Sequence, residues 1–305
     1  MKIFRDPIHN VINLDTGDKT TNKLIINLID SREFQRLRFI KQLGFAYLAY
    51  PSATHTRFEH SLGVAFLAKR FLERITSLED KNLTIVAALL HDIGHGPLSH
   101  SCEALTGISH EAWTKEIILG KTEVNDLLVK FDKNCPQTIC NILDSSEIIS
   151  GQLDVDRMDY LLRDSHMTGT GYGRFDLEWM LNVMTADIKN DKVEIGVVDK
   201  GQSVVEDFEM ARVYMYKNVY LHKTNLAAHN MLIALFNRLK SHFCPDESIK
   251  RVFLSGNKNT AELLDDYLSI TDVDLYYLLK QLQYSDDAVI RDLSYGLLNR
   301  KLDLL

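Results

Sequence analysis

A short apolar run that ends in a histidine and an aspartate constrains this chain more than any other feature. Residues 83–90 are almost entirely apolar, and His91 and Asp92 follow them directly. The run predicts a helix, and the glycines and proline within 94–97 predict that the helix ends there. Because neighbouring residues on a helix point roughly 100° apart, both polar side chains can reach one ion.

A second predicted helix and a charged segment supply further candidate ligands. The helix covers residues 57–75 and carries His60; its apolar stripe comprises Phe58, Leu62, Phe66, Leu67, Phe71, Leu72 and Ile75. Asp156 lies in the segment 152–164, which places carboxylates at positions 154, 156, 159 and 164. So many charges on an otherwise apolar segment require partners. We therefore group His60 and Asp156 with the adjacent histidine and aspartate.

Together, His60, His91, Asp92 and Asp156 predict a site for one divalent metal ion. Two imidazoles and two carboxylates form a mixed nitrogen and oxygen set, which suits manganese, iron, magnesium, zinc or nickel and does not select among them. Such a set leaves coordination positions for water and for a substrate oxygen. Because a bound divalent ion acidifies its water and screens phosphate charge, the four residues predict a metal-dependent phosphohydrolase.

Composition and charge narrow the class of protein. The 305 residues carry a net charge of −7, which argues against a surface that coats nucleic acid, so nucleic acid is not an expected partner. The first residues lack an apolar signal-peptide core, and no stretch of 18 uncharged apolar residues occurs, so we expect a cytoplasmic protein without a membrane span. The four cysteines show no Cys-x-x-Cys spacing and are expected to be reduced thiols.

Several ordered motifs resemble those of a known family, the HD-domain phosphohydrolases related to the SAM-and-HD-domain deoxynucleotide triphosphohydrolases. The matching segments are 4–9, 34–38, 41–44, 57–63, 91–100, 110–111, 154–160 and 220–223, so the resemblance covers most of the chain. It implies hydrolysis of deoxynucleoside triphosphates (dNTPs) to deoxynucleoside and inorganic triphosphate. It also implies a homo-oligomer, either a dimer or a tetramer.

The expected fold class is all-α, with the HD-domain helical fold and two minor β-hairpins. The hairpins are predicted within 3–14 and around 188–198, where Asn190 and Asp191 would form the turn. No low-complexity linker or internal repeat marks a second unit, so residues 1–305 are expected to form a single domain. Its metal-binding core would span about 50–165 and its helical C-terminal part 206–305. Relatives usually continue beyond this point, so a reduced C-terminal region is also expected.

Three histidines after the predicted ligand pair are candidates for catalysis. Hydrolysis requires a proton for the leaving oxygen, and histidine titrates in the useful range, so His110 is the preferred general acid, with Glu111 orienting it. His95 and His100 would then hold phosphate oxygens. Spacing alone equally allows His110 to cap the helix that starts at Glu111, and the resemblance favours the catalytic role.

Basic and polar residues are candidates for substrate contacts. Arg57 and Arg157 lie close to proposed ligands and suit phosphate oxygens, and the resemblance adds Lys223; Arg163 and Arg212 are weaker candidates. By the same resemblance, Gln42, Tyr160, Asp164 and Tyr220 would hold the sugar, with Tyr220 against C2′. Without the resemblance, both tyrosines are equally typical of half-buried helix packing.

Two further comparisons concern specificity and regulation. Where the triphosphohydrolases carry a His and Arg pair before the tyrosine, this chain has Tyr216 and Lys217, which puts the base, the number of phosphates held and the point of cleavage in doubt. Conversely, Lys2, Asp30, Gln35 and Arg38 match positions that bind a guanine nucleotide effector (GTP or dGTP) in regulated relatives. Equally, Asp30 could cap a helix that begins near Ser31, and Gln35 and Arg38 could lie on the exposed face of that helix.

Two alternative functions remain open from the sequence. The first keeps the metal site but releases phosphate or pyrophosphate from another nucleotide, as a phosphohydrolase or phosphodiesterase. The second is a nucleic-acid or effector-binding module with little hydrolase activity. The acidic charge and the lack of an aromatic and basic stripe count against the second alternative.

Overall fold

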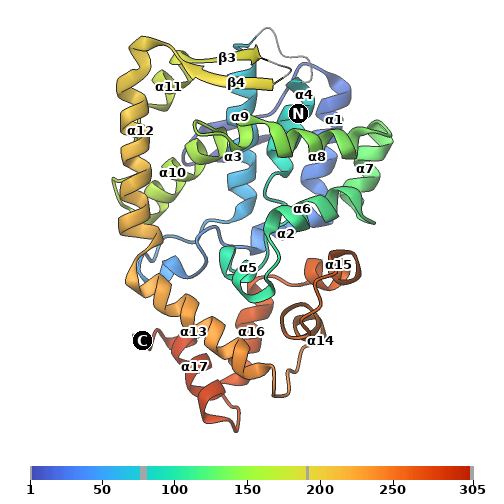
Figure 1. Cartoon of the computed structure of the whole chain (residues 1–305), viewed down its shortest axis with the longest axis vertical. Helices are drawn as coiled ribbons and strands as arrows, with labels where there is room; N and C mark the ends of the chain where they lie inside the picture. The colour runs from blue at the N-terminus through green and yellow to red at the C-terminus, as the bar shows by residue number, and fades with distance from the viewer. Residues whose placement is uncertain (1, 76–80, 190–191, 303–305) are drawn as a thin grey trace.

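Helix α3 (Arg57–Leu72) runs through the centre of the molecule, and α4 (Lys81–Leu90) and α10 (Val155–Thr168) pack against it (Figure 1). The structure is a computed structural model that describes residues 2–75, 81–189 and 192–302. Most side chains of α3 are buried, as expected for a helix enclosed by other elements. A capping box formed by Thr56 and Glu59 satisfies the first backbone N–H groups of the helix and fixes where it begins.

The close approach of α3 and α10 depends on Gly63. A Cβ atom at this position would overlap the carboxylate of Asp159 and the guanidinium of Arg163, both on α10. The absent side chain therefore lets the two helices pack at short range. This packing brings the first turn of α10, with Asp156, beside His60 on α3.

The remaining elements surround this central group. The N-terminal part contains α1 (Lys19–Asp30), α2 (Arg32–Arg36), η1 (Leu37–Phe39) and η2 (Gly44–Leu48). The middle part contains α5 (His100–Thr106), α6 (His110–Leu119), α7 (Glu123–Phe131), α8 (Cys135–Ser145), α9 (Glu147–Ser150) and α11 (Leu177–Val183). The C-terminal part contains η3 (Asp199–Gly201), α12 (Gln202–Met215), η4 (Tyr216–Tyr220), α13 (Lys223–Leu239), α14 (Glu247–Ile249), η5 (Lys250–Leu254), α15 (Thr260–Ser269), α16 (Asp272–Leu282) and α17 (Ala288–Asn299).

Two small antiparallel hairpins complete the fold. The other elements of the described residues are helices, which confirms the expected all-α class with minor hairpins. Strands β1 (Ile3–Asp6) and β2 (Asn10–Asn13) pair near the N-terminus, as expected. The second hairpin pairs β3 (Met184–Lys189) with β4 (Lys192–Val197), so it begins earlier than predicted, directly after α11. The turn expected at Asn190 and Asp191 lies outside the described residues.

Buried hydrophobic side chains from the N-terminal, middle and C-terminal parts form a contiguous core. In the C-terminal part, α13 and α16 both pack against α17 below the central helices (Figure 1). Within the described ranges, no helix is both long and apolar enough to cross a bilayer. The assignment of the whole chain to one domain stays a prediction.

Candidate functional site

The four candidate metal ligands come together in space from three different segments. His60 lies on α3, His91 and Asp92 directly follow the end of α4, and Asp156 lies in the first turn of α10. Nε2 of His60 is 3.0 Å from Oδ1 of Asp156 and 3.5 Å from Oδ2 of Asp92. Nε2 of His91 is 3.4 Å from Oδ1 of Asp92 and 3.5 Å from Oδ1 of Asp156. The predicted set therefore forms one cluster.

The donor atoms of this cluster suit a divalent cation. Nε2 of His60 and Nε2 of His91 are buried, and neither has a well-formed hydrogen bond with any described residue. Burial alone would lower the pKa of His60, but Asp156 and Asp159 outweigh it and raise this pKa to about 10. The surrounding carboxylates thus favour positive charge at this point. The described residues hold a histidine and aspartate cluster that could bind a metal ion.

A buried hydrogen-bond network orients the two imidazoles. Nδ1 of His60 donates to Asp159 at 2.8 Å, and His9 on the β1–β2 hairpin donates to the same carboxylate at 2.7 Å. Arg163 pairs with Asp159 and with Asp6, and it is buried. Nδ1 of His91 donates to the carbonyl of Ala88 at 2.9 Å. In both histidines the Nδ1 contact directs Nε2 toward the cluster, the arrangement typical of metal-binding histidines.

Two basic residues considered for phosphate, the favoured Arg157 and the weaker candidate Arg163, have other partners in the structure. Arg163 does not reach the pocket, because Asp6 and Asp159 hold it in the protein interior. Arg157 pairs with Asp154, the residue that caps α10, and with the carbonyl of Gly151, and it is not among the described pocket-lining residues. Sequence proximity to Asp156 did not predict this direction, since the side chain turns back toward the helix start.

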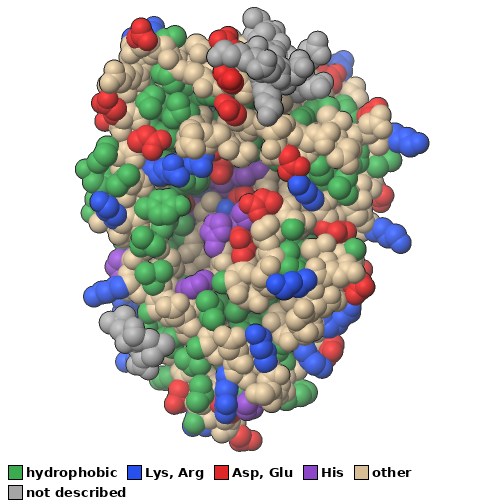
Figure 2. Space-filling view, viewed as in Figure 1, with side chains coloured by type: hydrophobic (Ala, Val, Ile, Leu, Met, Phe, Trp, Pro, Cys, Tyr) green, Lys and Arg blue, Asp and Glu red, His purple; other side chains and the backbone are tan. Residues whose placement is uncertain are grey.

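A pocket of about 420 Å³ opens beside the metal cluster. Figure 2 shows histidine side chains inside a hollow on this face of the molecule, next to acidic side chains. Arg57 lines the pocket, donates to Asp92 and, through Nε, to Oγ of Ser99 at 3.1 Å. It is the only lysine or arginine among the described lining residues. Lys223, the first residue of α13, is exposed and does not line the pocket.

The three histidines after the ligand pair lie together, and two of them contact Glu103. His95 stacks on His110, with ring centroids 3.9 Å apart, and its Nε2 lies 3.4 Å from Asp92. His110 and His100 both donate through Nδ1 to Oε1 of Glu103, at 2.7 and 3.0 Å. His100 is on the outer side, with 71% of its side chain exposed. Glu103 was not among the predicted site residues, although its spacing of three from His100 on a helix is a usable signal.

Two expectations about His110 are wrong. Ser109, and not His110, caps helix α6, because the Ser109 side chain accepts a hydrogen bond from the backbone of Ala112. Glu111 is also not the closest orienting group. Its Oε1 is 3.6 Å from Nε2 of His110 and its side chain is 66% exposed, whereas Glu103 contacts Nδ1 directly.

The stacked histidines differ in protonation. Burial and the positive charge of Arg57 hold the pKa of His95 well below its usual value. Burial also acts to lower the pKa of His110, but the hydrogen bond to Glu103 outweighs it and raises that pKa. The surroundings therefore favour the neutral form of His95 and the protonated form of His110. Pairs whose environments separate their pKa values are typical of acid and base roles in active sites.

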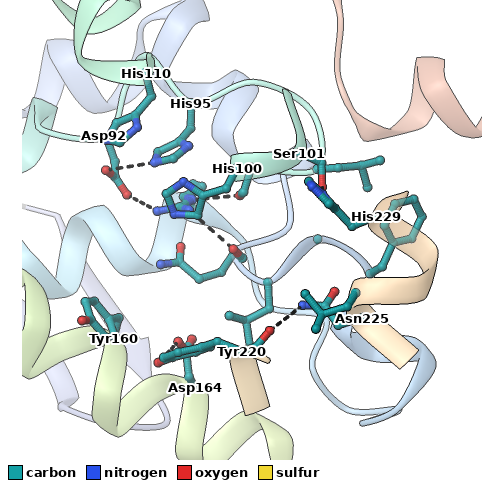
Figure 3. A pocket seen from close by; sticks show the side chains of 18 of the residues that line it. Asp92, His95, His100, Ser101, His110, Tyr160, Asp164, Tyr220, Asn225 and His229 are labelled. Atoms are coloured by element: carbon teal, nitrogen blue, oxygen red, sulfur yellow. Dashed lines mark hydrogen bonds and ion pairs between the residues drawn. The ribbon is translucent and has the colours of Figure 1, made fainter. Parts of the chain in front are cut away.

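The four residues expected to contact a sugar all line the pocket. They are Gln42, Tyr160, Asp164 and Tyr220, and the last three lie together in Figure 3. Asp164 accepts hydrogen bonds from the Tyr220 hydroxyl at 2.9 Å and from Nε2 of His55 at 2.7 Å. Tyr220 ends the π-helical segment η4, and Tyr216, at the start of that segment, also lines the pocket. Such π-helical turns are often found at functional sites.

Hydrogen bonds from residues far away in the sequence fix the loop that carries His95. Leu98 and Ser99 adopt positive φ angles of 57° and 53°, which are uncommon for residues other than glycine. Buried Asp272, the first residue of α16, accepts a hydrogen bond from the backbone N–H of Leu98 at 2.7 Å. Arg36 donates to the carbonyl of His95 at 2.8 Å. Neither anchor lies in a local sequence motif, so neither was predicted.

The candidate effector residues cluster near the N-terminus and contact one another. Lys2 pairs with Asp30, Gln35 donates to the carbonyl of Ile29, and Arg38 donates to Gln35 at 2.9 Å. Asp30 is not the cap of the next helix, since Ser31 occupies that position and its side chain accepts from Phe34. Binding of an effector at these residues stays a prediction.

Comparison with known proteins identifies several relatives. Residues 57–164 match the family model of the HD domain. The chain is similar to the uncharacterized protein YwfO of Bacillus subtilis, with 37% identity over 320 residues that cover 99% of this chain and 71% of that protein. A crystal structure of a phosphohydrolase from Bacteroides thetaiotaomicron superposes with a TM-score of 0.85 and 30% identity, and the match covers 99% of this chain and 77% of that one.

A more distant relative carries a named activity. The deoxynucleoside triphosphate triphosphohydrolase SAMHD1 of Danio rerio is 28% identical over 335 residues. The match covers 93% of this chain and 51% of the relative, so this chain spans about half the length of SAMHD1.

Proposed function

Because this chain belongs to the HD-domain phosphohydrolase family, we propose that it is a metal-dependent enzyme that hydrolyses dNTPs to deoxynucleoside and inorganic triphosphate. One observation carries the proposal. The buried Nε2 atoms of His60 and His91, which form no hydrogen bond with the described residues, face two carboxylates at the wall of a pocket that also contains Arg57 and a histidine with a raised pKa. Metal ligands, a phosphate partner and a proton donor are the groups that phosphate ester hydrolysis requires.

His60, His91, Asp92 and Asp156 would hold one divalent ion. When bound, the ion supplies positive charge that screens phosphate oxygens and acidifies a water molecule. Asp159 orients His60, and the carbonyl of Ala88 orients His91. These contacts keep both imidazoles in place before substrate arrives.

His110 would protonate the leaving oxygen. Oε1 of Glu103 lies 2.7 Å from Nδ1 of His110 and raises the pKa of the imidazole, which favours the form that also carries a proton on Nε2. Transfer of that proton to the sugar oxygen avoids the release of an alkoxide as the P–O bond breaks. His95, neutral and stacked on His110, and His100 at the rim would contact phosphate oxygens.

Substrate contacts follow from the walls of the pocket. The buried guanidinium of Arg57 would spread the negative charge of the phosphates. Gln42, Tyr160 and Asp164 would contact the sugar hydroxyl, and Tyr220, fixed by Asp164, would lie against C2′ and disfavour ribose. The proposal includes a homo-oligomer, and GTP or dGTP as an effector at Lys2, Asp30, Gln35 and Arg38.

A second candidate function uses the same site with a different substrate. Tyr216 lines the pocket at the position where the SAM-and-HD-domain triphosphohydrolases carry histidine, and this difference changes the polarity of the pocket. An enzyme with fewer phosphate contacts could instead release phosphate or pyrophosphate from another nucleotide.

Product analysis tests the proposal and separates the two functions. The protein would be loaded in turn with manganese, iron, magnesium, zinc or nickel and incubated with each dNTP and ribonucleotide, with and without GTP or dGTP. The expected result is free deoxynucleoside and inorganic triphosphate in equal amounts. Monophosphate, pyrophosphate or orthophosphate would favour the second function, and no turnover under any condition would contradict both.

A further inference from the structure

One side of the pocket differs in chemistry from the rest and has no role in the proposed reaction. We define the distal wall as Ser101, Asn225, Leu226 and His229. Figure 3 shows Ser101, Asn225 and His229 on the opposite side of the pocket from Asp92, His95 and His110. Any ligand bound at the metal cluster and extending across the pocket would meet this wall.

Helix α13 presents two of these residues on one face. Asn225 and His229 are four positions apart, so their side chains lie one above the other on the helix. The Asn225 amide nitrogen donates to the carbonyl of Tyr220 at 3.2 Å, and this contact sets the orientation of the amide. Nδ1 of His229 is 2.9 Å from the hydroxyl of Ser101 on α5. Two polar groups are therefore positioned beside the pocket.

Each of these groups keeps hydrogen-bonding capacity for a ligand. Oδ1 of Asn225 is an acceptor and its amide retains a second N–H, while Nε2 of His229 donates or accepts according to the tautomer, because the Ser101 hydroxyl can pair with Nδ1 in either role. An ionised phosphate group has no hydrogen-bond donor, so it would leave Oδ1 of Asn225 without a partner. A flat heterocycle with both N–H groups and ring acceptors complements the pair.

The distal wall also lacks charged side chains, which favours an uncharged ligand group over a phosphate. None of its residues is lysine, arginine, aspartate or glutamate, and burial lowers the pKa of His229, which disfavours a positive charge on this imidazole. Leu226 supplies apolar surface within the wall, and Leu43, Phe45 and Leu98 add apolar surface elsewhere in the pocket lining. An uncharged wall with apolar surface and a few oriented polar groups suits an aromatic ring with a polar edge and does not suit a polyphosphate.

We infer that the distal wall is the nucleobase subsite and that Asn225 and His229 contact the polar edge of the base. The inference rests on the proposed function, because it takes the phosphates of the same nucleotide to lie at the metal cluster. It assigns Asn225 and His229 as specificity-determining residues.

Equilibrium binding with and without a base tests the subsite. The ligands are the four dNTPs and 2-deoxyribose 5-triphosphate, which has the same sugar and phosphates but no base. Calorimetry would use the manganese-loaded full chain carrying His110→Gln to slow turnover. Asn225→Leu and His229→Phe each keep the side-chain size and remove the proposed contacts. Asn230→Leu, an exposed position on the same helix, is the matched control.

We expect both variants to lose about tenfold or more in affinity for at least one dNTP and to change the ranking of the four bases. Affinity for the abasic triphosphate should stay within about twofold, which excludes a disturbance of Tyr220 through the lost Asn225 contact. Equal affinity of the parent protein for dNTPs and the abasic compound would overturn the subsite while leaving the proposed function intact. Equal losses of affinity for the dNTPs and for the abasic triphosphate in the two variants would also overturn the subsite. Binding of neither ligand by the parent protein would overturn the nucleotide assignment itself.

Discussion

Nδ1 of His60 lies 2.8 Å from Oδ2 of Asp159, although 99 positions separate the two residues. Both side chains are fully buried, and the same carboxylate also accepts a hydrogen bond from His9. The proposed metal ligand is thus oriented by a carboxylate that is itself fixed from the N-terminal hairpin. This relationship links the packing of α3 on α10 to the geometry of the candidate metal centre.

Loss of a proposed ligand should remove the metal and the activity together. We expect Asp156→Ala, and the double variant with His91→Ala and Asp92→Ala, to lose bound metal and to lower turnover by at least about a hundredfold. Metal content by mass spectrometry, initial rates and far-ultraviolet circular dichroism provide the measurements. Full activity in either variant with unchanged helicity would refute the assignment of these ligands.

Gly63→Ala tests the close packing behind His60. The added Cβ would push Asp159 and Arg163 away, which should weaken metal binding about tenfold or more and destabilise the fold by about 1–3 kcal/mol. Metal titration and thermal unfolding measure the two effects. Gly171→Ala is the control, because a Cβ there meets open space. Equal metal affinity in both variants would contradict the proposed link.

Glu103→Gln tests the proton donor through pH dependence. Since Glu103 raises the pKa of His110, activity that needs protonated His110 is retained at low pH and lost as pH rises through this raised pKa. Removing the carboxylate lowers the pKa, so the alkaline limb of the kcat profile should move to lower pH. Glu111→Gln should leave that limb nearly in place, because its carboxylate is exposed and more distant. Comparable shifts in both variants would argue against Glu103 as the orienting group.

Asp272→Ala tests the anchor of the His95 loop. The substitution leaves the buried backbone N–H of Leu98 and the partly buried backbone N–H of Lys41 without their acceptor, and the loss at Leu98 alone should cost about 1–3 kcal/mol. Turnover should fall while bound metal is retained, since Asp272 contacts none of the four proposed ligands. Chemical denaturation and metal analysis measure this, with exposed Asp286→Ala as control. Wild-type stability would show that the loop does not need this contact.

The four cysteines should be unreactive in the folded protein. Burial raises the pKa of Cys102 to about 12 and that of Cys135 to about 11, and the pKa values of Cys140 and Cys244 are also raised. Because the thiolate is the reactive form, a disulfide reagent at pH 8 should label the native protein slowly and all four thiols after denaturation. Rapid labelling of the native chain would be the contrary outcome.

Local patterns in the sequence were sufficient for the helical class and for the candidate ligands. The run 83–90, the breakers after it and the density of carboxylates in 152–164 each depend on residues close together in the chain, so periodicity and spacing reveal them. The same is true of the hairpin within 3–14. Side-chain direction was harder to predict. Arg157, Arg163 and Lys223 carry the right charge for phosphate, but they do not line the pocket.

What the sequence determined by itself is the helical fold class and the chemical identity of a candidate site made from His60, His91, Asp92 and Asp156. Only the tertiary structure decided which partners orient that site: Asp159 with His9, Glu103 with His110, and Asp272 beneath the His95 loop. It also decided that α13 faces the pocket with Asn225 and His229. The reason is physical. Helix periodicity is a local property of the chain, whereas a buried polar group finds its partner among distant residues that only packing brings within hydrogen-bond distance.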